Sequence, residues 1–140
     1  MIEIVNAGGV TSALGFSAGG THAGLKSEIG SLDLGLLISD RNSNVAATFT
    51  TNKIESPSVS VSRERLKRGT ARGVVANSGC ANCSVGNQGY KDAEEMTILG
   101  AAQAGVLPEE LFVASTGVIG VELPMALIRQ NIGNIKIDLE

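Results

Sequence analysis

The sequence has few aromatic residues and no surplus of positive charge. Its 140 residues include three Phe, one Tyr and no Trp, and the formal net charge is −3. Proteins that bind nucleic acids stack bases on aromatic side chains or neutralise phosphates with Lys and Arg. The densest basic run, residues 63–68, is interrupted by Glu64 and is typical of the solvated face of a short helix. We therefore expect no nucleic-acid partner.

The sequence also lacks a long hydrophobic run and a basic leader. Its longest aliphatic run, residues 36–38, is far short of the roughly 20 residues that span a bilayer. The first four residues carry no basic side chain, and two cysteines are too few for the disulfide framework of a secreted domain. These absences predict a cytoplasmic protein with no membrane partner.

Histidine and cysteine are too scarce to indicate a metal or redox centre. Cys80 and Cys83 have the spacing of a dithiol or of half a zinc site, but the only histidine, His22, is remote in sequence. We expect no metal, and we expect both cysteines to pack as small side chains in a tight loop. His22 has no identifiable nucleophile as a partner, so a structural role is favoured over that of a catalytic base. The glycine-rich residues 17–24 match neither nucleotide-binding fingerprint.

Small residues are abundant, and they favour close backbone packing. There are 18 glycines, and Ala93, Met96, Gly100 and Ala101 recur at helical spacing, which predicts a smooth helix face lying on a sheet. We expect strands at 32–39, 45–51, 73–76 and 111–114, a turn-rich loop at 40–44, helices at 62–69, 91–104 and 124–133, and a further element opening at 134–140. Ser62 is the expected N-cap of the first helix. This order predicts an α+β fold, with residues 1–140 forming a single domain.

Two polar loops are the strongest candidates for a functional site. Residues 77–82 follow one predicted strand, and residues 115–120 follow another. In the second loop the Thr116 hydroxyl lies beside the backbone N–H of Gly117, which are the two donors that an oxyanion hole requires. Taken alone, a Ser-Thr-Gly sequence also suits an ordinary turn.

The order of the motifs along nearly the whole chain resembles a known family. The two most specific motifs are Asn-Ser-Gly-x-Ala-Asn at 77–82 and Ser-Thr-Gly-Val-Ile-Gly at 115–120, the latter followed by Leu-Pro-Met at 123–125. Weaker matches include Gly9-Val10-Thr11, Ala23-Gly24-Leu25-Lys26, Asp33-Leu34, Phe49-Thr50-Thr51-Asn52 and Gly86-Asn87-Gln88-Gly89. The chain resembles the N-terminal (alpha) part of the bifunctional ornithine acetyltransferase/glutamate N-acetyltransferase family of arginine biosynthesis.

The resemblance implies a fold, a reaction and partners. The fold would be the self-processing type shared with DmpA-like aminopeptidases, in which autocatalytic cleavage exposes a threonine nucleophile at the start of a C-terminal (beta) chain. Acetyl would pass from N-acetylornithine, or from acetyl-CoA in bifunctional members, to glutamate, with no other cofactor. Thr116 and Gly117 match the oxyanion hole of the family. Two alpha and two beta chains would form a heterotetramer.

The sequence departs from the family pattern in two respects. Cys80 and Cys83 stand where the family commonly has Asn and Ala, and the cleavage pair and nucleophile would lie beyond Glu140. We therefore expect an alpha chain that ends before the cleavage site and needs a partner for catalysis. An amide-hydrolysing relative on the same scaffold and a non-catalytic assembly module remain the alternatives.

Overall fold

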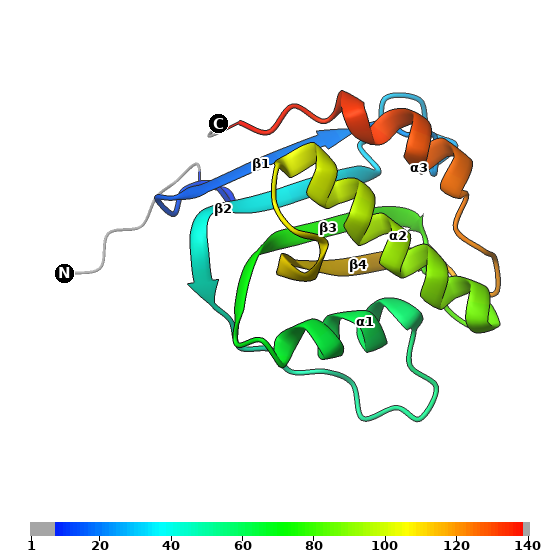
Figure 1. The fold of residues 1–140 in the computed structure, drawn as a ribbon. Coiled ribbons are helices and arrows are strands. Elements are labelled where there is room, and N and C mark those ends of the chain that lie inside the picture. Colours follow the sequence, from blue (N-terminus) through cyan, green and yellow to red (C-terminus); the bar gives the residue numbers. More distant parts are fainter. Residues whose placement is uncertain (1–7, 139–140) are drawn as a thin grey trace.

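The chain forms a four-stranded sheet with helices packed on it, described by a computed structural model over residues 8–138. The elements in chain order are β1 (Phe16–Thr21), β2 (Leu34–Asn44), α1 (Pro57–Leu66), β3 (Thr70–Cys80), α2 (Gly86–Ala104), the 3-10 turn η1 (Pro108–Glu110), β4 (Leu111–Val118), α3 (Met125–Asn131) and the 3-10 turn η2 (Ile132–Asn134). The spatial strand order is β1-β2-β3-β4 (Figure 1). The β1–β2 and β2–β3 pairs are antiparallel and the β3–β4 pair is parallel, so the predicted α+β class is confirmed.

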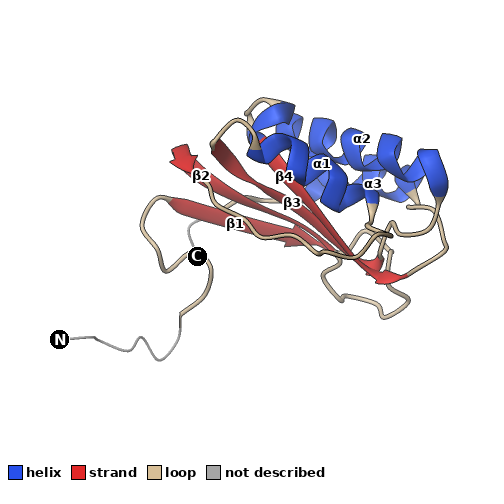
Figure 2. Ribbon diagram, turned by 90° about the horizontal axis from the view of Figure 1, so that it is seen from below, coloured by secondary structure: helices blue, strands red, loops and turns tan. Residues whose placement is uncertain are grey.

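Helices α1, α2 and α3 cover one face of this sheet, and the hydrophobic core lies between the two layers (Figure 2). The small-residue face predicted for α2 is confirmed, because Ala93, Met96 and Ala101 are almost fully buried. A Cβ placed on Gly100 would already lie 3.1 Å from Val75 on β3. Helix and sheet therefore approach closely, and neither has room for larger side chains at this contact.

Helix α1 is fastened to the edge strand β4 by serine hydroxyls. Ser62 Oγ donates to the carbonyl of Val113 at 2.8 Å and accepts from the N–H of Val113 at 3.1 Å. Ser58 Oγ donates to Ser115 Oγ at 2.9 Å. These bonds occupy polar groups that an edge strand would otherwise leave unpaired. The predicted N-cap role of Ser62 is wrong, since α1 begins earlier and Ser56 caps it by accepting from the N–H of Val59.

Several predicted boundaries also need correction. Residues 45–51 form no strand, and this segment instead runs alongside α1, where the Arg63 guanidinium lies 5.3 Å from the ring of Phe49 and contacts Glu55. The loop expected at 40–44 belongs to β2, which has an irregular register between Ile38 and Ser43. Glycine-rich residues 16–21 form β1, a strand that the sequence did not predict. Helix α2 begins at Gly86, earlier than predicted, and α3 with η2 confirms the last helix.

The C-terminal segment runs along the helix-covered side of β1. Asp138 forms an antiparallel bridge with Ala18, which agrees with the expectation of a new element opening here, while residues 139–140 lie outside the described part. A Cβ on Gly19 would collide with the carbonyl of Lys136, so this close crossing depends on glycine. Within residues 8–138, no helix combines the length and apolarity needed to cross a membrane.

The other face of the sheet carries no helix within residues 8–138 (Figure 2). Its lining is mostly apolar. A row of paired residues crosses all four strands on this side: Ala18, Leu37, Val74 and Phe112. Two hollows of about 340 and 330 Å³ lie over the row, and Leu37 and Val74 line both. We call this surface the open face. Apolar hollows on a sheet face are typical of a site that another polypeptide or a ligand covers.

Candidate active site

The two sequence motifs meet at one end of the sheet, where β3 and β4 run side by side. Ser78 lies opposite Thr116 and Gly79 lies opposite Gly117 in the parallel register. The prediction of two loops needs correction, because β3 extends to Cys80 and β4 to Val118, so both motifs start as paired strand. The register of the two strands, which the sequence did not predict, brings the two motifs together at this end of the sheet.

Gly79 and Gly117 are glycines for a steric reason. Both have positive φ, +117° and +134°, in a region that residues with a side chain rarely adopt. A Cβ on Gly117 would collide with the backbone of Gly79 and Cys80, and a Cβ on Gly79 would lie 2.6 Å from the carbonyl oxygen of Leu25. The two strand ends therefore lock against each other and against the loop that contains Leu25.

Thr116 is exposed at this end of the sheet, on the same side as the open face. Side chains alternate along β4, so Ser115 points toward α1, where it meets Ser58, and Thr116 points to the opposite side. Thr116 lines a cavity of about 260 Å³ together with Asp33, Ala76 and Ser78. The cavity is large enough for a small acyl group with its solvent, so the Thr116 hydroxyl is placed where a ligand could reach it.

Asp33 is the residue near this cavity to which the sequence assigned no role. Its carboxylate is fully buried and accepts backbone N–H groups from Ala23 at 2.6 Å and Lys26 at 3.0 Å. Burial raises the pKa of this carboxyl, but the N–H donors and the nearby His22 outweigh burial and hold the pKa below its ordinary value of 3.8. Asp33 is therefore charged at neutral pH. An aspartate between a turn-like glycine segment and a strand is a signal that could have identified it.

The remaining motif residues brace the strand ends from inside. Asn77 Nδ2 donates to the carbonyl of Cys80 at 2.8 Å, and the fully buried Asn82 donates to the carbonyl of Gly89 in the first turns of α2. Cys80 is a buried free thiol whose Sγ lies 3.2 Å from the carbonyl of Val121, and Cys83 is a partly exposed free thiol. Both cysteines sit beside the β3 terminus as small side chains, which fits the expected packing role.

His22 is hydrogen-bonded, as its structural interpretation predicts. Its Nδ1 lies 2.8 Å from the carbonyl oxygen of Ser31 and 3.4 Å from a carboxylate oxygen of Asp33. The residues that line the Thr116 cavity do not include His22. The ring therefore helps to close the loop between β1 and β2, and nothing brings it to Thr116.

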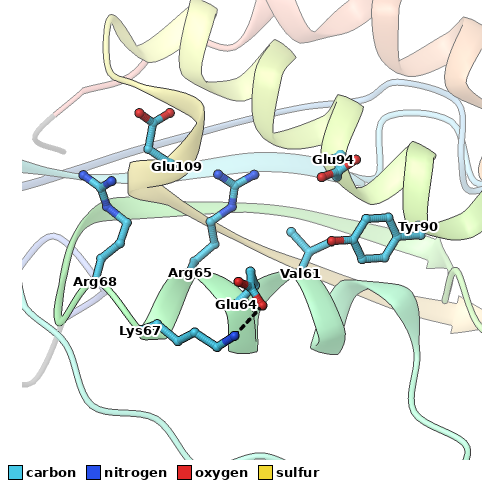
Figure 3. A pocket seen from close by; sticks show the side chains of 8 residues that line it. All are labelled: Val61, Glu64, Arg65, Lys67, Arg68, Tyr90, Glu94 and Glu109. Carbon is cyan, nitrogen blue, oxygen red and sulfur yellow. Dashed lines mark hydrogen bonds and ion pairs between the residues drawn. The ribbon is translucent and has the colours of Figure 1, made fainter.

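A further hollow, of about 390 Å³, lies between α1, α2 and the η1 turn (Figure 3). Its lining mixes both charge signs with one aromatic ring and one aliphatic side chain: Val61, Glu64, Arg65, Lys67, Arg68, Tyr90, Glu94 and Glu109. Lys67 is paired with Glu64, and Arg65 donates to Thr97. The basic run is thus largely a solvated helix face, as predicted, on the helical side of the sheet and away from the open face.

Solved structures define the class of protein that this architecture represents. The chain superposes with a TM-score of 0.90 on an arginine biosynthesis bifunctional protein ArgJ from Bacillus halodurans, at 36% identity over 95% of this chain and 69% of that one. It superposes equally well on an ornithine acetyltransferase from Mycobacterium tuberculosis, solved with ornithine, at 32% identity over 97% of this chain and 74% of that one. Because one of these neighbours is an ornithine acetyltransferase and both superpose over nearly the whole chain, the predicted acetyltransferase-like fold is confirmed.

Sequence relatives identify the family. The ArgJ family model matches residues 17–140. Curated proteins named arginine biosynthesis bifunctional protein ArgJ are 41% identical over 91% of this chain in Staphylococcus epidermidis and 46% identical over 86% in Geobacter sulfurreducens. The chain belongs to the ArgJ family. It spans about a third of the length of these relatives, 32% and 30% respectively.

Proposed function

We propose that this chain is the oxyanion-binding part of an enzyme that transfers acetyl from N-acetylornithine to glutamate. Membership of the ArgJ family supports the reaction, and so does the likeness to the ornithine acetyltransferase of M. tuberculosis. The observation that carries the proposal is the position of Thr116, exposed beside a cavity of about 260 Å³, with Gly117 locked next to it.

The proposed role of Thr116 and Gly117 is to stabilise negative charge. When a nucleophile attacks the acetyl carbonyl, the oxygen becomes an oxyanion, and fixed hydrogen-bond donors stabilise it more than the starting carbonyl. The Thr116 hydroxyl and the Gly117 N–H would be those donors. Because the neighbouring strand and loop hold Gly117 sterically, its N–H would need little reorganisation during the reaction.

A partner chain would supply the nucleophile. In the proposed reaction its terminal threonine oxygen bonds to the acetyl carbon, the carbon–nitrogen bond to ornithine breaks, and the threonine proton goes to the departing amine through the chain's free terminal amine. The glutamate amine then bonds to the acetyl carbon, the ester bond to the threonine oxygen breaks, and the amine proton returns to that oxygen through the terminal amine. We propose that the partner packs on the open face, in a heterotetramer of two chains of each kind. The length of the relatives supports this, because about two thirds of each lies outside the matched region.

The test is an acetyl-transfer assay on this chain assembled with its proposed C-terminal partner. Incubation with acetyl-labelled N-acetylornithine and glutamate should yield labelled N-acetylglutamate, while the purified chain alone should be inactive. Labelled acetate without transfer would instead indicate an amide hydrolase, and inertness of a stable assembly would indicate a non-catalytic module. A parallel assay with acetyl-CoA as donor decides whether this molecule is a substrate, which we propose as the only role for a coenzyme here.

A further inference from the structure

Burying the charged carboxylate of Asp33 costs hydration free energy, and the contacts of this carboxylate indicate its role. The carboxylate has no solvent exposure, yet it binds two backbone N–H groups of the loop that follows β1, those of Ala23 and Lys26. A buried carboxylate is tolerated only when hydrogen bonds compensate for lost hydration, and such charge-assisted bonds are stronger than neutral ones. The carboxylate thus fixes the path of residues 23–26, which we call the Asp33 loop.

The Asp33 loop is wedged against the end of β3. Leu25 lies in the middle of the loop, and its carbonyl oxygen would be 2.6 Å from a Cβ on Gly79. Asp33 also reaches β3 directly, because its backbone carbonyl accepts the N–H of Ser78 at 2.8 Å. The residue therefore holds both positions of β3 that lie opposite the proposed oxyanion site, by its main chain at Ser78 and by the loop at Gly79.

The contact continues from β3 to β4. Gly79 and Gly117 are register partners, and the Gly79 backbone lies so close to Gly117 that Gly117 has no room for a side chain. A displacement of Leu25 would allow Gly79 to move, and Gly117 would lose the surface against which it is held. The path from the Asp33 carboxylate to Gly117 consists of hydrogen bonds and direct backbone contacts at every step.

We propose that Asp33 is a positioning residue for the oxyanion site: its carboxylate holds the Asp33 loop against Gly79 and so fixes the orientation of Thr116 and Gly117. The expected effect on kcat rests on the proposed acyl transfer. The structural coupling between the Asp33 loop and the ends of β3 and β4 does not depend on that proposal. Asp33 does not need to touch substrate, and its charge acts only through the backbone that it binds.

The variant Asp33→Asn tests this with little change in shape. An asparagine keeps one acceptor oxygen but turns an N–H donor group toward the second backbone N–H, so one of the two loop bonds is lost. In the assembled enzyme we expect kcat to fall about 10- to 100-fold with KM changed less than about threefold, because misplaced groups weaken transition-state stabilisation more than substrate binding. The matched control is Asp40→Asn, which alters an exposed aspartate paired with Arg41 on the same strand.

Hydrogen–deuterium exchange of the same assembled proteins gives a readout that does not require activity. With Asp33→Asn, exchange should accelerate at least fivefold in residues 22–32 and also in residues 77–80 and 115–118, with α2 unchanged. The variant Gly79→Ala should accelerate exchange at the two strand ends and should not lower kcat further when combined with Asp33→Asn.

The outcomes separate the two proposals. Faster exchange confined to residues 22–32, or a kcat equal to that of Asp40→Asn, would overturn the positioning role. If Asp33→Asn only lowers the amount of folded protein and leaves kcat per folded molecule unchanged, the positioning role is also overturned. If the unaltered assembly transfers no acetyl group, the proposed function fails, while the exchange at residues 115–118 still decides whether Asp33 holds that strand end.

Discussion

At the scale of single residues, Thr116 is the most informative position to change. Thr116→Ala removes one donor that strengthens as negative charge develops, so the loss should fall mainly on kcat. By the usual effect of an oxyanion donor we expect a drop of about 100-fold, equivalent to about 3 kcal/mol. Steady-state kinetics of the assembled enzyme measures it, on protein first confirmed as processed by mass spectrometry, since the same donor could assist self-cleavage.

Thr116→Ser is the matched control, because it keeps the hydroxyl and removes only a methyl group. It should lower kcat by much less than Thr116→Ala. Thr116 is exposed in this chain, so neither change should affect the stability of the sheet. A near-normal kcat in fully processed Thr116→Ala would show that the oxyanion is held elsewhere.

In contrast to Thr116, Cys80 and Cys83 are expected to be dispensable for activity. Cys80 packs beside the 118–122 segment and Cys83 is partly exposed, and nothing in their surroundings gives either thiol a catalytic partner among the described residues. The double variant Cys80→Ala/Cys83→Ala should keep most of the activity, with a stability loss of about 1 kcal/mol for the buried position. Stoichiometric zinc in elemental analysis of the unaltered protein, together with inactivation by a chelator, would contradict this expectation.

At the scale of elements, those with a periodic sequence pattern could be predicted, and those that depend on contacts distant in sequence could not. The buried face of α2 followed from Ala93, Met96 and Ala101, because helical spacing reports directly on burial. The strand predicted at 45–51 failed because β propensity needs a neighbouring strand, and this segment meets the Arg63 side chain of α1 instead. β1 was missed because Gly19 serves a close crossing by residues 135–136, a contact distant in sequence.

The site was partly predictable for the same reason. Thr116 and Gly117 could be singled out from a local motif, since a hydroxyl next to a glycine is readable from the sequence alone. Their parallel register with Ser78 and Gly79 depends on the β3–α2–β4 crossover, and the role of Asp33 depends on a loop from another part of the chain. Long-range geometry of this kind leaves only a weak trace in a single sequence.

The attachment of α1 to β4 gives an element-scale prediction. Ser62→Ala removes a hydroxyl that satisfies both the N–H and the carbonyl of Val113, leaving these buried groups unpaired. Each unsatisfied buried group costs about 1–3 kcal/mol, so we expect the free energy of unfolding to fall by about 2–3 kcal/mol. Chemical denaturation monitored by circular dichroism measures the change.

Ser60→Ala is the control for this measurement, because Ser60 lies on the same helix and bonds the partly exposed Glu55. It should cost less than about 0.5 kcal/mol. Equal losses for the two variants would show that helix propensity, and not the bond to the edge strand, accounts for the effect.

At the scale of the whole molecule, the uneven distribution of helices has a functional consequence. Helices α1, α2 and α3 cover one face. The open face carries the row Ala18, Leu37, Val74 and Phe112, of which Phe112 is already buried, with Thr116 at the end of the same surface. A partner that covers the row would also close over the proposed oxyanion site. Covering it excludes water, which strengthens electrostatic stabilisation there. Assembly and catalysis should therefore depend on the same surface.

Val74→Asp tests this dependence directly. Val74 lines both apolar hollows of the open face, so a carboxylate there would be buried without a partner when the second chain docks. We expect association with the C-terminal partner to weaken by on the order of 100-fold or more, and acetyl transfer to fall in parallel, as measured by co-purification and by activity at increasing partner concentration. The control is Ile98→Asp, an equally drastic change at an exposed position of α2 on the helix-covered side, which should leave both unchanged. If Val74→Asp assembles normally, the partner binds elsewhere. If it assembles poorly but recovers full activity at high partner concentration, the open face serves assembly alone and the geometry at Thr116 does not depend on it.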